Sequence, residues 1–162
     1  RRDYDRIRDR KQSFPQRQYL KELAKRKPAD EVSFLIESVS PLIEDHTRAV
    51  CPSCPDVCCI NRHSYHDQND LSYLRALGEN VPSYNLEVAD SAPCQFMGDH
   101  GCRLKRSLRP YRCTWYFCTP LLDDIQKKSV RKYRVLIDAL RCITQKRMEM
   151  LDEFAQKPKK PG

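Results

Sequence analysis

The chain has 162 residues, of which 40% are hydrophobic and 32% charged, with four glycines and eleven prolines. This length is enough for one domain with its own hydrophobic core. No apolar run reaches the roughly 18 residues of a membrane span, and the first residues (Arg1, Arg2, Asp3) do not resemble a signal peptide. We therefore expect a cytoplasmic protein without a membrane span.

The net charge of +8 is unevenly distributed along the chain. Residues 1–27 carry eleven Lys/Arg and four Asp/Glu, whereas residues 28–102 carry three Lys/Arg and twelve Asp/Glu. Residues 103–112 carry five Lys/Arg and no Asp/Glu. Residues 121–162 carry eleven Lys/Arg and six Asp/Glu. The pattern predicts a basic, partly flexible N-terminal arm (1–27), a single domain (28–156) and a basic tail (157–162). The basic ends are either solvated or contact nucleic acid or an acidic protein.

The first strong helical pattern covers residues 30–50. Asp30 is the expected N-cap, and Ser40 followed by Pro41 indicates that the helix restarts there. The apolar positions fall at helical spacing. They are Val32, Leu35, Ile36, Val39 and Ile43.

Residues 51–66 are expected to be a loop that holds paired cysteines. A short helix follows, capped by Asp67 or Asn69 and stopped by Gly78. Residues 79–120 contain four prolines and no long period, so we expect irregular chain organised by metal ligands, with a few short strands at most.

The last helix is expected over residues 121–154. Its apolar face is interrupted by Arg147. That face consists of Tyr133, Leu136, Leu140, Ile143, Met150 and Phe154. The predicted fold is a small, mainly α domain whose flanking helices (30–50 and 121–154) frame a cysteine-rich core (51–118).

Nine cysteines are the outstanding feature of the composition. Their odd number and their Cys-x-x-Cys spacing favour metal ligation over structural disulfides. Zinc and the irons of iron–sulfur clusters both prefer about four thiolates, and a Cys-x-x-Cys turn directs two sulfurs toward one centre. The candidate metal ligands are Cys51, Cys54, Cys58, Cys59, Cys94, Cys102, Cys113 and Cys118.

These motifs resemble the bacterial cysteine-cluster proteins with a zinc- or iron-chelating domain, the CxxCxxCC or YkgJ-type family. The matching features are the Cys51–Cys59 cluster, Pro93-Cys94, Gly101-Cys102, and Arg109-Pro110 with Cys113 and Cys118. The resemblance covers residues 51–118 and implies metal chelation by eight cysteines without a defined reaction. The chain departs from the family in having three residues between Cys54 and Cys58, and Thr114 where the family often has arginine.

The metal and the number of centres stay open at this point. Adjacent residues rarely direct both sulfurs to one tetrahedral centre, so Cys58 and Cys59 either serve two centres or include one bystander. An iron–sulfur protein with a redox, sensing or modification-partner role is the favoured hypothesis. The alternative is a zinc-stabilised module whose basic ends bind nucleic acid or an acidic protein. Whether the protein is an enzyme stays open, because no catalytic motif accompanies the cysteines.

Several other residues are candidates for minor roles. Cys142 lies off the apolar face of the last helix and is expected to be a non-ligand thiol, and the four histidines (His46, His63, His66, His100) are weak ligand candidates. The basic strip Arg103, Lys105, Arg106, Arg109 and Arg112 is either an exposed loop or compensates thiolate charge. The aromatic run Trp115, Tyr116 and Phe117 is expected to cover the metal, with base stacking as the alternative.

Overall fold

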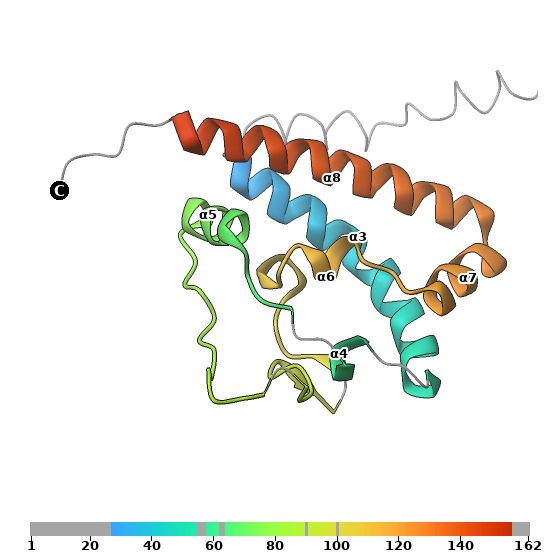
Figure 1. The fold of residues 1–162 in the computed structure, drawn as a ribbon. Coiled ribbons are helices and arrows are strands. Elements are labelled where there is room, and N and C mark those ends of the chain that lie inside the picture. Colours follow the sequence, from blue (N-terminus) through green and yellow to red (C-terminus); the bar gives the residue numbers. More distant parts are fainter. Residues whose placement is uncertain (1–26, 55–57, 62–63, 90, 100, 157–162) are drawn as a thin grey trace, which may run out of the picture.

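A computed structural model describes residues 27–54, 58–61, 64–89, 91–99 and 101–156 (Figure 1). The predicted N-terminal arm and basic tail, together with His63 and His100, lie outside the described residues apart from Lys27. Within these ranges the protein is mainly helical, as predicted. The longest helices form one layer, and the cysteine-bearing loops extend from one side of it (Figure 1).

Helix α3 begins earlier than the sequence pattern indicated, at Pro28, and ends at Val50. Lys27 is the N-cap, with an extended backbone, and Pro28 takes the first helical position. Proline is favourable there because its missing N–H would have no helical partner. The prediction of Asp30 as N-cap is therefore wrong; Asp30 lies in the first turn, where its charge complements the helix dipole.

The predicted restart of this helix at Pro41 is also wrong, because α3 continues through the proline. A proline inside a helix removes one backbone hydrogen bond and costs about 3 kcal/mol. Pro41 itself is exposed, whereas Val39 and Ile43 on either side of it are buried. Burial of this apolar face offsets the local cost, so tertiary packing holds the helix together.

The predicted last helix is two helices in the structure. Helix α7 (Thr119–Lys128) ends at Ser129, whose backbone is extended, and α8 (Val130–Gln156) follows. The Ser129 hydroxyl accepts a hydrogen bond from the Lys132 amide at 3.2 Å, which caps the start of α8. The break lets α7 and α8 both pack against α3. The prediction of one continuous helix fails because a single capping serine interrupts an otherwise helical pattern.

Helix α5 (Gln68–Leu77) agrees with the prediction. Asp67 is its N-cap and forms a capping box with Asp70, while Gly78 ends it with a positive φ of 77°. This helix packs against α8 and α3. The resulting core comprises Ala29, Val32, Leu35, Ile36, Val39, Ile43, Tyr73, Leu74, Leu121, Ile125, Leu136, Leu140, Ile143 and Met150.

The remaining elements are short. They are η1 (Cys51–Ser53), α4 (Cys58–Asn61), β1 (Met97–Gly98), β2 (Gly101–Cys102), η2 (Arg106–Leu108) and α6 (Arg112–Trp115). The two strands pair antiparallel, so the expectation of short strands in irregular chain is confirmed, whereas residues 51–66 contain more helix than expected. None of the helices in the described ranges has both the length and the apolar character to cross a membrane.

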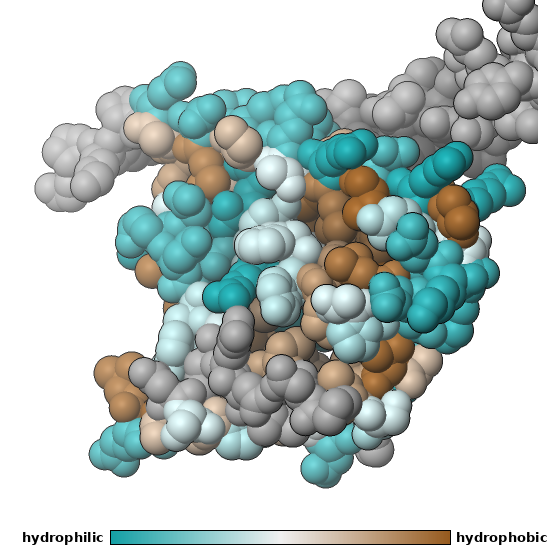
Figure 2. Space-filling view, turned by 45° about the vertical axis from the view of Figure 1, so that its right-hand side comes forward, coloured by the Kyte–Doolittle hydropathy of each residue, from teal (hydrophilic) through white to brown (hydrophobic). Residues whose placement is uncertain are grey.

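Hydrophilic side chains cover much of the face shown in Figure 2, with separate apolar patches between them. Among the large apolar residues that are exposed are Trp115 (49%), Tyr116 (36%) and Met148 (61%). Phe154 is 37% exposed, so the buried face of α8 ends at Met150 and not at Phe154 as predicted.

Candidate metal centres

All nine cysteines lie within the described ranges, and no disulfide joins any of them. The eight candidate ligands are on the short elements and loops beyond the C-terminal end of α3 and before α7. Seven of them are half-buried, whereas Cys59 is exposed. Cys142 lies on α8 and is also exposed.

Cys51 and Cys54 lie directly after α3. The Cys51 amide donates to the Thr47 carbonyl and so continues the helix, and the Cys54 amide donates to the Cys51 carbonyl at 3.2 Å. Burial raises the pKa of the Cys51 thiol, and the charges of Cys58, Cys118 and Cys54 raise it further. Cys51 therefore lies within electrostatic reach of a cysteine 67 positions along the chain.

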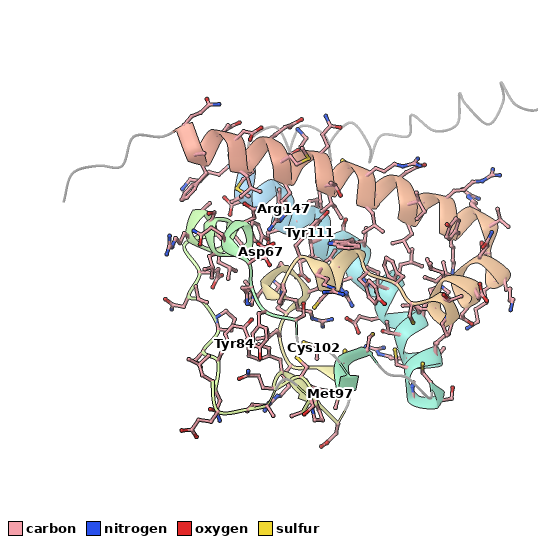
Figure 3. The ribbon with its side chains drawn as sticks, viewed as in Figure 1. Asp67, Tyr84, Met97, Cys102, Tyr111 and Arg147 are labelled. Carbon is pink, nitrogen blue, oxygen red and sulfur yellow. The ribbon has the colours of Figure 1, made fainter. Side chains whose placement is uncertain are left out.

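Cys59 and Cys94 are joined through the backbone. The Cys94 amide donates to the Cys59 carbonyl at 2.7 Å, and the Cys94 carbonyl accepts from Met97 at 2.8 Å. Met97 pairs with Cys102 across the two-stranded sheet, which turns at Gly101 with a φ of 108°. Main-chain contacts thus connect Cys59, Cys94 and Cys102. Figure 3 shows Met97 and Cys102, the pair that joins the two strands.

Cys113, on α6, completes this neighbourhood. Burial raises the pKa of its thiol, a hydrogen bond from Ser64 lowers it, and the charges of Cys102 and Cys94 raise it. A hydrogen bond with Cys58 raises the pKa of the Cys59 thiol. Although the residue as a whole is exposed, partial desolvation of the thiol and the charges of Cys58, Cys113 and Cys94 raise this pKa further. The two sequence clusters, 51–59 and 94–118, are therefore interleaved in space.

These sulfurs are neighbours, but they do not form a closed coordination shell. Within the described residues, no group of three or more His, Cys, Asp or Glu side chains is arranged closely enough to hold a metal ion. Thiol sulfurs without a cation repel one another once ionised, and closure of such sites is commonly coupled to metal binding. The donor chemistry of the eight thiols suits zinc or iron–sulfur irons, whereas their arrangement in this structure does not form a coordination site for either.

Two buried donors beside the cysteines also fit a thiolate site. The Nε2 atom of Gln95 and the Oγ1 atom of Thr114 have no hydrogen-bond partner among the described residues. The orientation of the Gln95 amide is fixed, because its Oε1 atom accepts from the Asn85 amide at 2.7 Å. Buried donors normally have partners, and ligand sulfurs commonly accept such bonds. Gln95 was not singled out from the sequence, and Thr114 was named only as a departure from the family pattern. Their positions directly after Cys94 and Cys113 were the available signal.

The basic strip is only partly an exposed loop. Arg106 is 4% exposed and donates to Ser40, to Glu44 and, at 3.1 Å, to the Cys113 carbonyl. Arg109 contacts Glu44 at 3.2 Å. Burial opposes ionisation of Glu44, but Arg106 and Arg109 outweigh this effect and lower its pKa. Arg103, Lys105 and Arg112 are exposed, as one of the two interpretations predicted for the whole strip. Compensation of thiolate charge by the other two arginines stays a prediction.

A polar stripe on α3 positions this strip. Glu37 accepts from the Ser107 amide at 2.8 Å, and Ser40 and Glu44 bind Arg106. Residues 37, 40 and 44 share one helix face because of their spacing of three and four. The sequence analysis missed this stripe. The spacing of three and four between its polar residues, in a chain that also has a basic strip, could have indicated it.

A second polar contact fixes the chain just before Cys113. The Asp70 carboxylate accepts from Arg147 at 2.6 Å and from the Tyr111 amide at 3.1 Å. The Arg147 guanidinium also lies 4.5 Å from the centre of the Tyr111 ring (Figure 3). The residue that interrupts the apolar face of α8 is therefore a buried ion-pair partner that ties α8 to α5 and to the cysteine region.

The two described histidines are engaged elsewhere. The Nε2 atom of His66 lies 3.0 Å from the Leu108 carbonyl oxygen, so it donates, and Nδ1 accepts from the Tyr84 hydroxyl. Burial, together with the charges of Cys94, Cys113 and Asp70, raises the pKa of Tyr84 to about 12. His46 contacts Asp124 of α7 at 2.8 Å. Both histidines, given as weak ligand candidates, thus have hydrogen-bond partners other than the cysteines.

The aromatic run has two different environments. Phe117 packs against the core, whereas Trp115 is 49% exposed and Tyr116 has the Arg112 guanidinium 5.3 Å from its ring centre. Phe117 is therefore the only one of the three that packs against the core. Trp115 and Tyr116 form an aromatic and basic surface instead.

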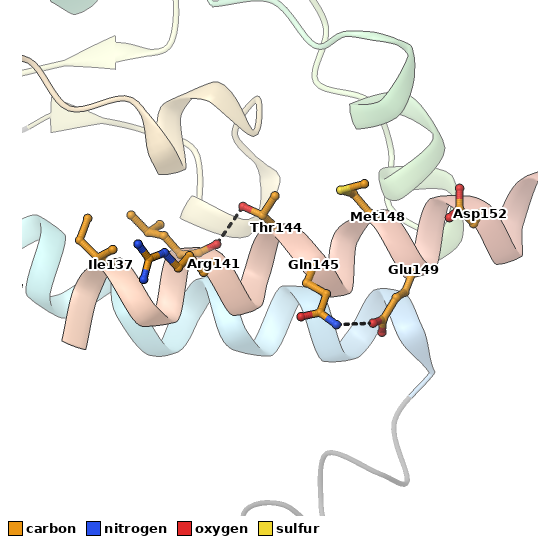
Figure 4. Close-up of a pocket in the computed structure, with 8 residues that line it drawn as sticks. Ile137, Arg141, Thr144, Gln145, Met148, Glu149 and Asp152 are labelled. Atoms are coloured by element: carbon orange, nitrogen blue, oxygen red, sulfur yellow. Dashed lines mark hydrogen bonds between the residues drawn. The ribbon is translucent and has the colours of Figure 1, made fainter. Parts of the chain in front are cut away.

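A shallow groove along α8 contains none of the candidate ligands. Its lining includes Leu140, Thr144, Gln145 and Glu149. Thr144 donates to the Leu140 carbonyl at 2.8 Å and Gln145 to Glu149 at 3.0 Å, so these polar groups are paired within the helix (Figure 4).

Comparison with family models, curated proteins and solved structures finds no significant match for this chain. Its function therefore has to be argued from its own residues.

Proposed function

We propose that this protein binds metal through Cys51, Cys54, Cys58, Cys59, Cys94, Cys102, Cys113 and Cys118, as an iron–sulfur protein. The observation that carries the proposal is the gathering of thiols from both sequence clusters beside one another, without a disulfide, next to buried donors that lack partners among the described residues. The resemblance to the CxxCxxCC family supports the same ligand set.

The surroundings of the thiols favour iron–sulfur chemistry over isolated zinc ions. Arg106 binds the Cys113 backbone, and the charge of Arg109 lowers the pKa of that thiol. Donors, nearby cations and partial burial are the features by which proteins tune cluster potentials. A bound cluster supplies one-electron chemistry, and the protein positions the sulfurs and restricts water. A redox, sensing or modification-partner role follows.

The test is anaerobic purification of the full chain from iron-replete cells. The expected product is brown, shows sulfide-to-iron charge-transfer absorption, and contains iron and acid-labile sulfide in matching amounts. A colourless protein with stoichiometric zinc would show that the bound metal is zinc and not an iron–sulfur cluster, while the proposed ligands stay the same. A chain without metal and with eight freely alkylated candidate ligands would refute metal binding altogether.

A zinc-stabilised binding module is the second candidate function. It is favoured by the exposed Trp115 and by Arg112 over the Tyr116 ring, since stacked aromatics with arginine suit nucleobases. We expect such binding to weaken steeply with salt. Replacing Trp115 and Tyr116 by alanine should then reduce affinity for single-stranded RNA or DNA, with exposed Met148→Ala as the control. No affinity at low salt excludes this candidate.

A further inference from the structure

The shallow groove along α8 has an apolar floor. Ile137, Leu140 and Met148 supply this apolar surface, and Met148 is 61% exposed. Figure 4 shows Ile137, Thr144 and Met148 following one another along the helix. The described residues that line the groove all belong to α8. Exposed apolar surface of this kind is a place where another segment can bury its own apolar side chains.

We infer that residues 16–26 of the N-terminal arm pack in this groove as a helix. Tyr19 and Leu20 lie four and three residues before Leu23, so the three side chains share one face of such a helix. The inference goes beyond the proposed function and does not depend on bound metal. It gives the basic arm a binding surface within its own chain, in place of nucleic acid or another protein.

The polar side chains of the groove are already paired, which leaves its apolar part available. Thr144 donates to a carbonyl oxygen of the preceding turn at 2.8 Å, and Gln145 donates to Glu149 at 3.0 Å. Arg141 lies 3.5 Å from Asp138, so its charge has a partner on the helix surface. A segment with leucine and tyrosine side chains therefore buries apolar surface here without leaving these polar groups unpaired.

The arm joins the fold beside the groove. Lys27 is the N-cap of α3, and Glu31 in the first turn of that helix lies 3.5 Å from Lys146 of α8. Lys146 also contacts Glu149 at 3.1 Å, and Glu149 lines the groove. Ion pairs thus connect the start of α3 to the groove, so the residues that precede Lys27 have only a short distance to bridge.

The lengths of the arm segment and of the groove match. Eleven helical residues, 16–26, span about 16 Å at 1.5 Å per residue, and about the same rise separates Ile137 from Met148. The backbone of Lys27 is extended, as is usual before a proline, so a helix formed by residues 16–26 ends before α3 begins. The arm can therefore turn back along α8 and does not have to extend α3.

The charges of the arm segment and of the groove rim are opposite. Residues 16–26 carry four Lys/Arg and one Asp/Glu, whereas residues 148–156 carry three Asp/Glu and no Lys/Arg. Asp152, which lines the groove, and Glu153 have no ion-pair partner among the described residues. Three of the basic residues of the arm recur at every fourth position, along one edge of the expected helix: Arg17, Lys21 and Lys25. Charge complementarity therefore favours this segment at the C-terminal half of α8.

The experiment is hydrogen exchange, followed by mass spectrometry, on the full chain as purified. We expect the amides of residues 16–26 to exchange about tenfold more slowly than in a synthetic peptide of the same sequence. Met148→Asp places a charge on the groove floor and should remove this protection. The matched control is Val135→Asp, because Val135 is also an apolar residue of α8, 58% exposed, but does not line the groove.

The exchange data have two outcomes that contradict the inference. Exchange of residues 16–26 at the rate of the free peptide in the wild-type chain would overturn the packing of the arm. Loss of protection in both variants, or in neither of them, would show that the arm does not lie in this groove. Unchanged exchange of α3 in the Met148→Asp variant verifies that the helical core has stayed folded.

Carboxylate labelling with a carbodiimide and glycine ethyl ester tests the same contact from the arm side. Leu23→Asp should raise the labelling rate of Asp152 several-fold, because the packed arm otherwise covers this carboxylate. Gln18→Asp should leave the rate unchanged, since position 18 falls on the far side of the expected helix from Leu23. Asp123 of α7, 54% exposed, is the internal reference.

Equal labelling of Asp152 in the wild-type chain and in the Leu23→Asp variant would also overturn the inference. This arm substitution lies outside the hydrophobic core, so the result does not depend on whether a groove variant folds. Neither measurement uses bound metal as its readout. Failure of the arm to pack and failure of the chain to bind metal are therefore separate results.

Discussion

The helical layer and the cysteine-bearing loops of this protein are held together in different ways. In the layer, α3, α7 and α8 share a continuous apolar core, and the buried charge of Arg147 is paired with Asp70. The loops contain a two-residue hairpin and single helical turns, and buried donors at Gln95 and Thr114 lack partners among the described residues. The helical core also contains one buried hydroxyl without a hydrogen-bond partner among the described residues, that of Tyr73 on α5. The two regions therefore differ mainly in that a large apolar core holds the helices, whereas short elements and a few polar contacts hold the loops.

The difference indicates a division of labour. The layer supplies stability, and it fixes the loops at a few polar points: Glu37, Ser40 and Glu44 on α3, and Asp70 on α5. Under the proposed function, the loops supply the ligands, and metal binding completes their arrangement. Removing metal, breaking the polar contacts and replacing the unpaired donors should therefore change the stability of the helices and of the loops in different ways.

The largest effect is expected from metal removal. Chelation under anaerobic conditions should expose the amides of residues 51–61 and 94–118 to hydrogen exchange, while the central turns of α3 and α8 stay protected. Apparent binding energies of structural zinc sites are about 10–16 kcal/mol, far above the strength of the hairpin alone. Simultaneous loss of protection in α3 and α8 would show that the layer also depends on metal.

The next effect concerns the buried ion pair between the two regions. Replacing Asp70 by alanine leaves the Arg147 charge buried and removes the acceptor of the Tyr111 amide, so we expect a loss of about 3–5 kcal/mol in the free energy of unfolding. Denaturant titration measures this change. The matched control is Asp138→Ala, whose partner Arg141 is 3.5 Å away and whose side chain is 76% exposed, where we expect about 0–1 kcal/mol. Equal losses in the two variants would contradict the role assigned to Asp70.

A smaller effect, dependent on pH, is expected at Glu44. Its folded-state pKa is lowered from the ordinary value of 4.5, so its ionised form adds stability above about pH 4.5. This contribution is lost as the pH falls through the folded-state pKa. Glu44→Gln should cost about 1–2 kcal/mol at neutral pH, with allowance for partial exposure of the carboxylate, and the difference from wild type should shrink at acid pH. A difference that stays constant from neutral to acid pH would exclude the charge as its cause.

The helices and the ligand candidates could be predicted from sequence because their signals are local. The α3 positions from Val32 to Ile43 repeat at helical spacing, and Asp67 and Gly78 are residue types with strong end preferences. The break at Ser129 was missed because one capping residue changes the path without changing the apolar period on either side.

The pairing of distant residues could not be predicted in the same way. Arg147 and Asp70 are 77 positions apart. Arg147 stands out in the sequence as an interruption of an apolar face, but nothing there identifies Asp70 as its partner. The proximity of Cys118 to Cys51 depends on how α7 packs along α3, and the spacing of cysteines in the sequence does not predict this packing. Sequence therefore indicates which residues are candidate ligands, and tertiary packing decides which of them meet.

The smallest predicted effect distinguishes an unpaired donor from a paired one. Thr114 is 1% exposed and its hydroxyl has no partner among the described residues, so Thr114→Val should leave the metal-free chain unchanged or stabilise it by up to about 1 kcal/mol. The control is Thr144→Val, which removes the 2.7 Å hydrogen bond to the Tyr111 hydroxyl and should destabilise by about 1 kcal/mol. In the metal-loaded chain the gain at Thr114 should disappear, because a hydroxyl beside Cys113 then has thiolate acceptors within its surroundings. Thermal unfolding of each variant with and without metal measures whether the substitution stabilises or destabilises the chain. If Thr114→Val destabilises the metal-free chain as much as Thr144→Val does, the Thr114 hydroxyl has a hydrogen-bond partner in the absence of metal. The polar groups of the loops would then be better paired than the comparison with the helical layer implies.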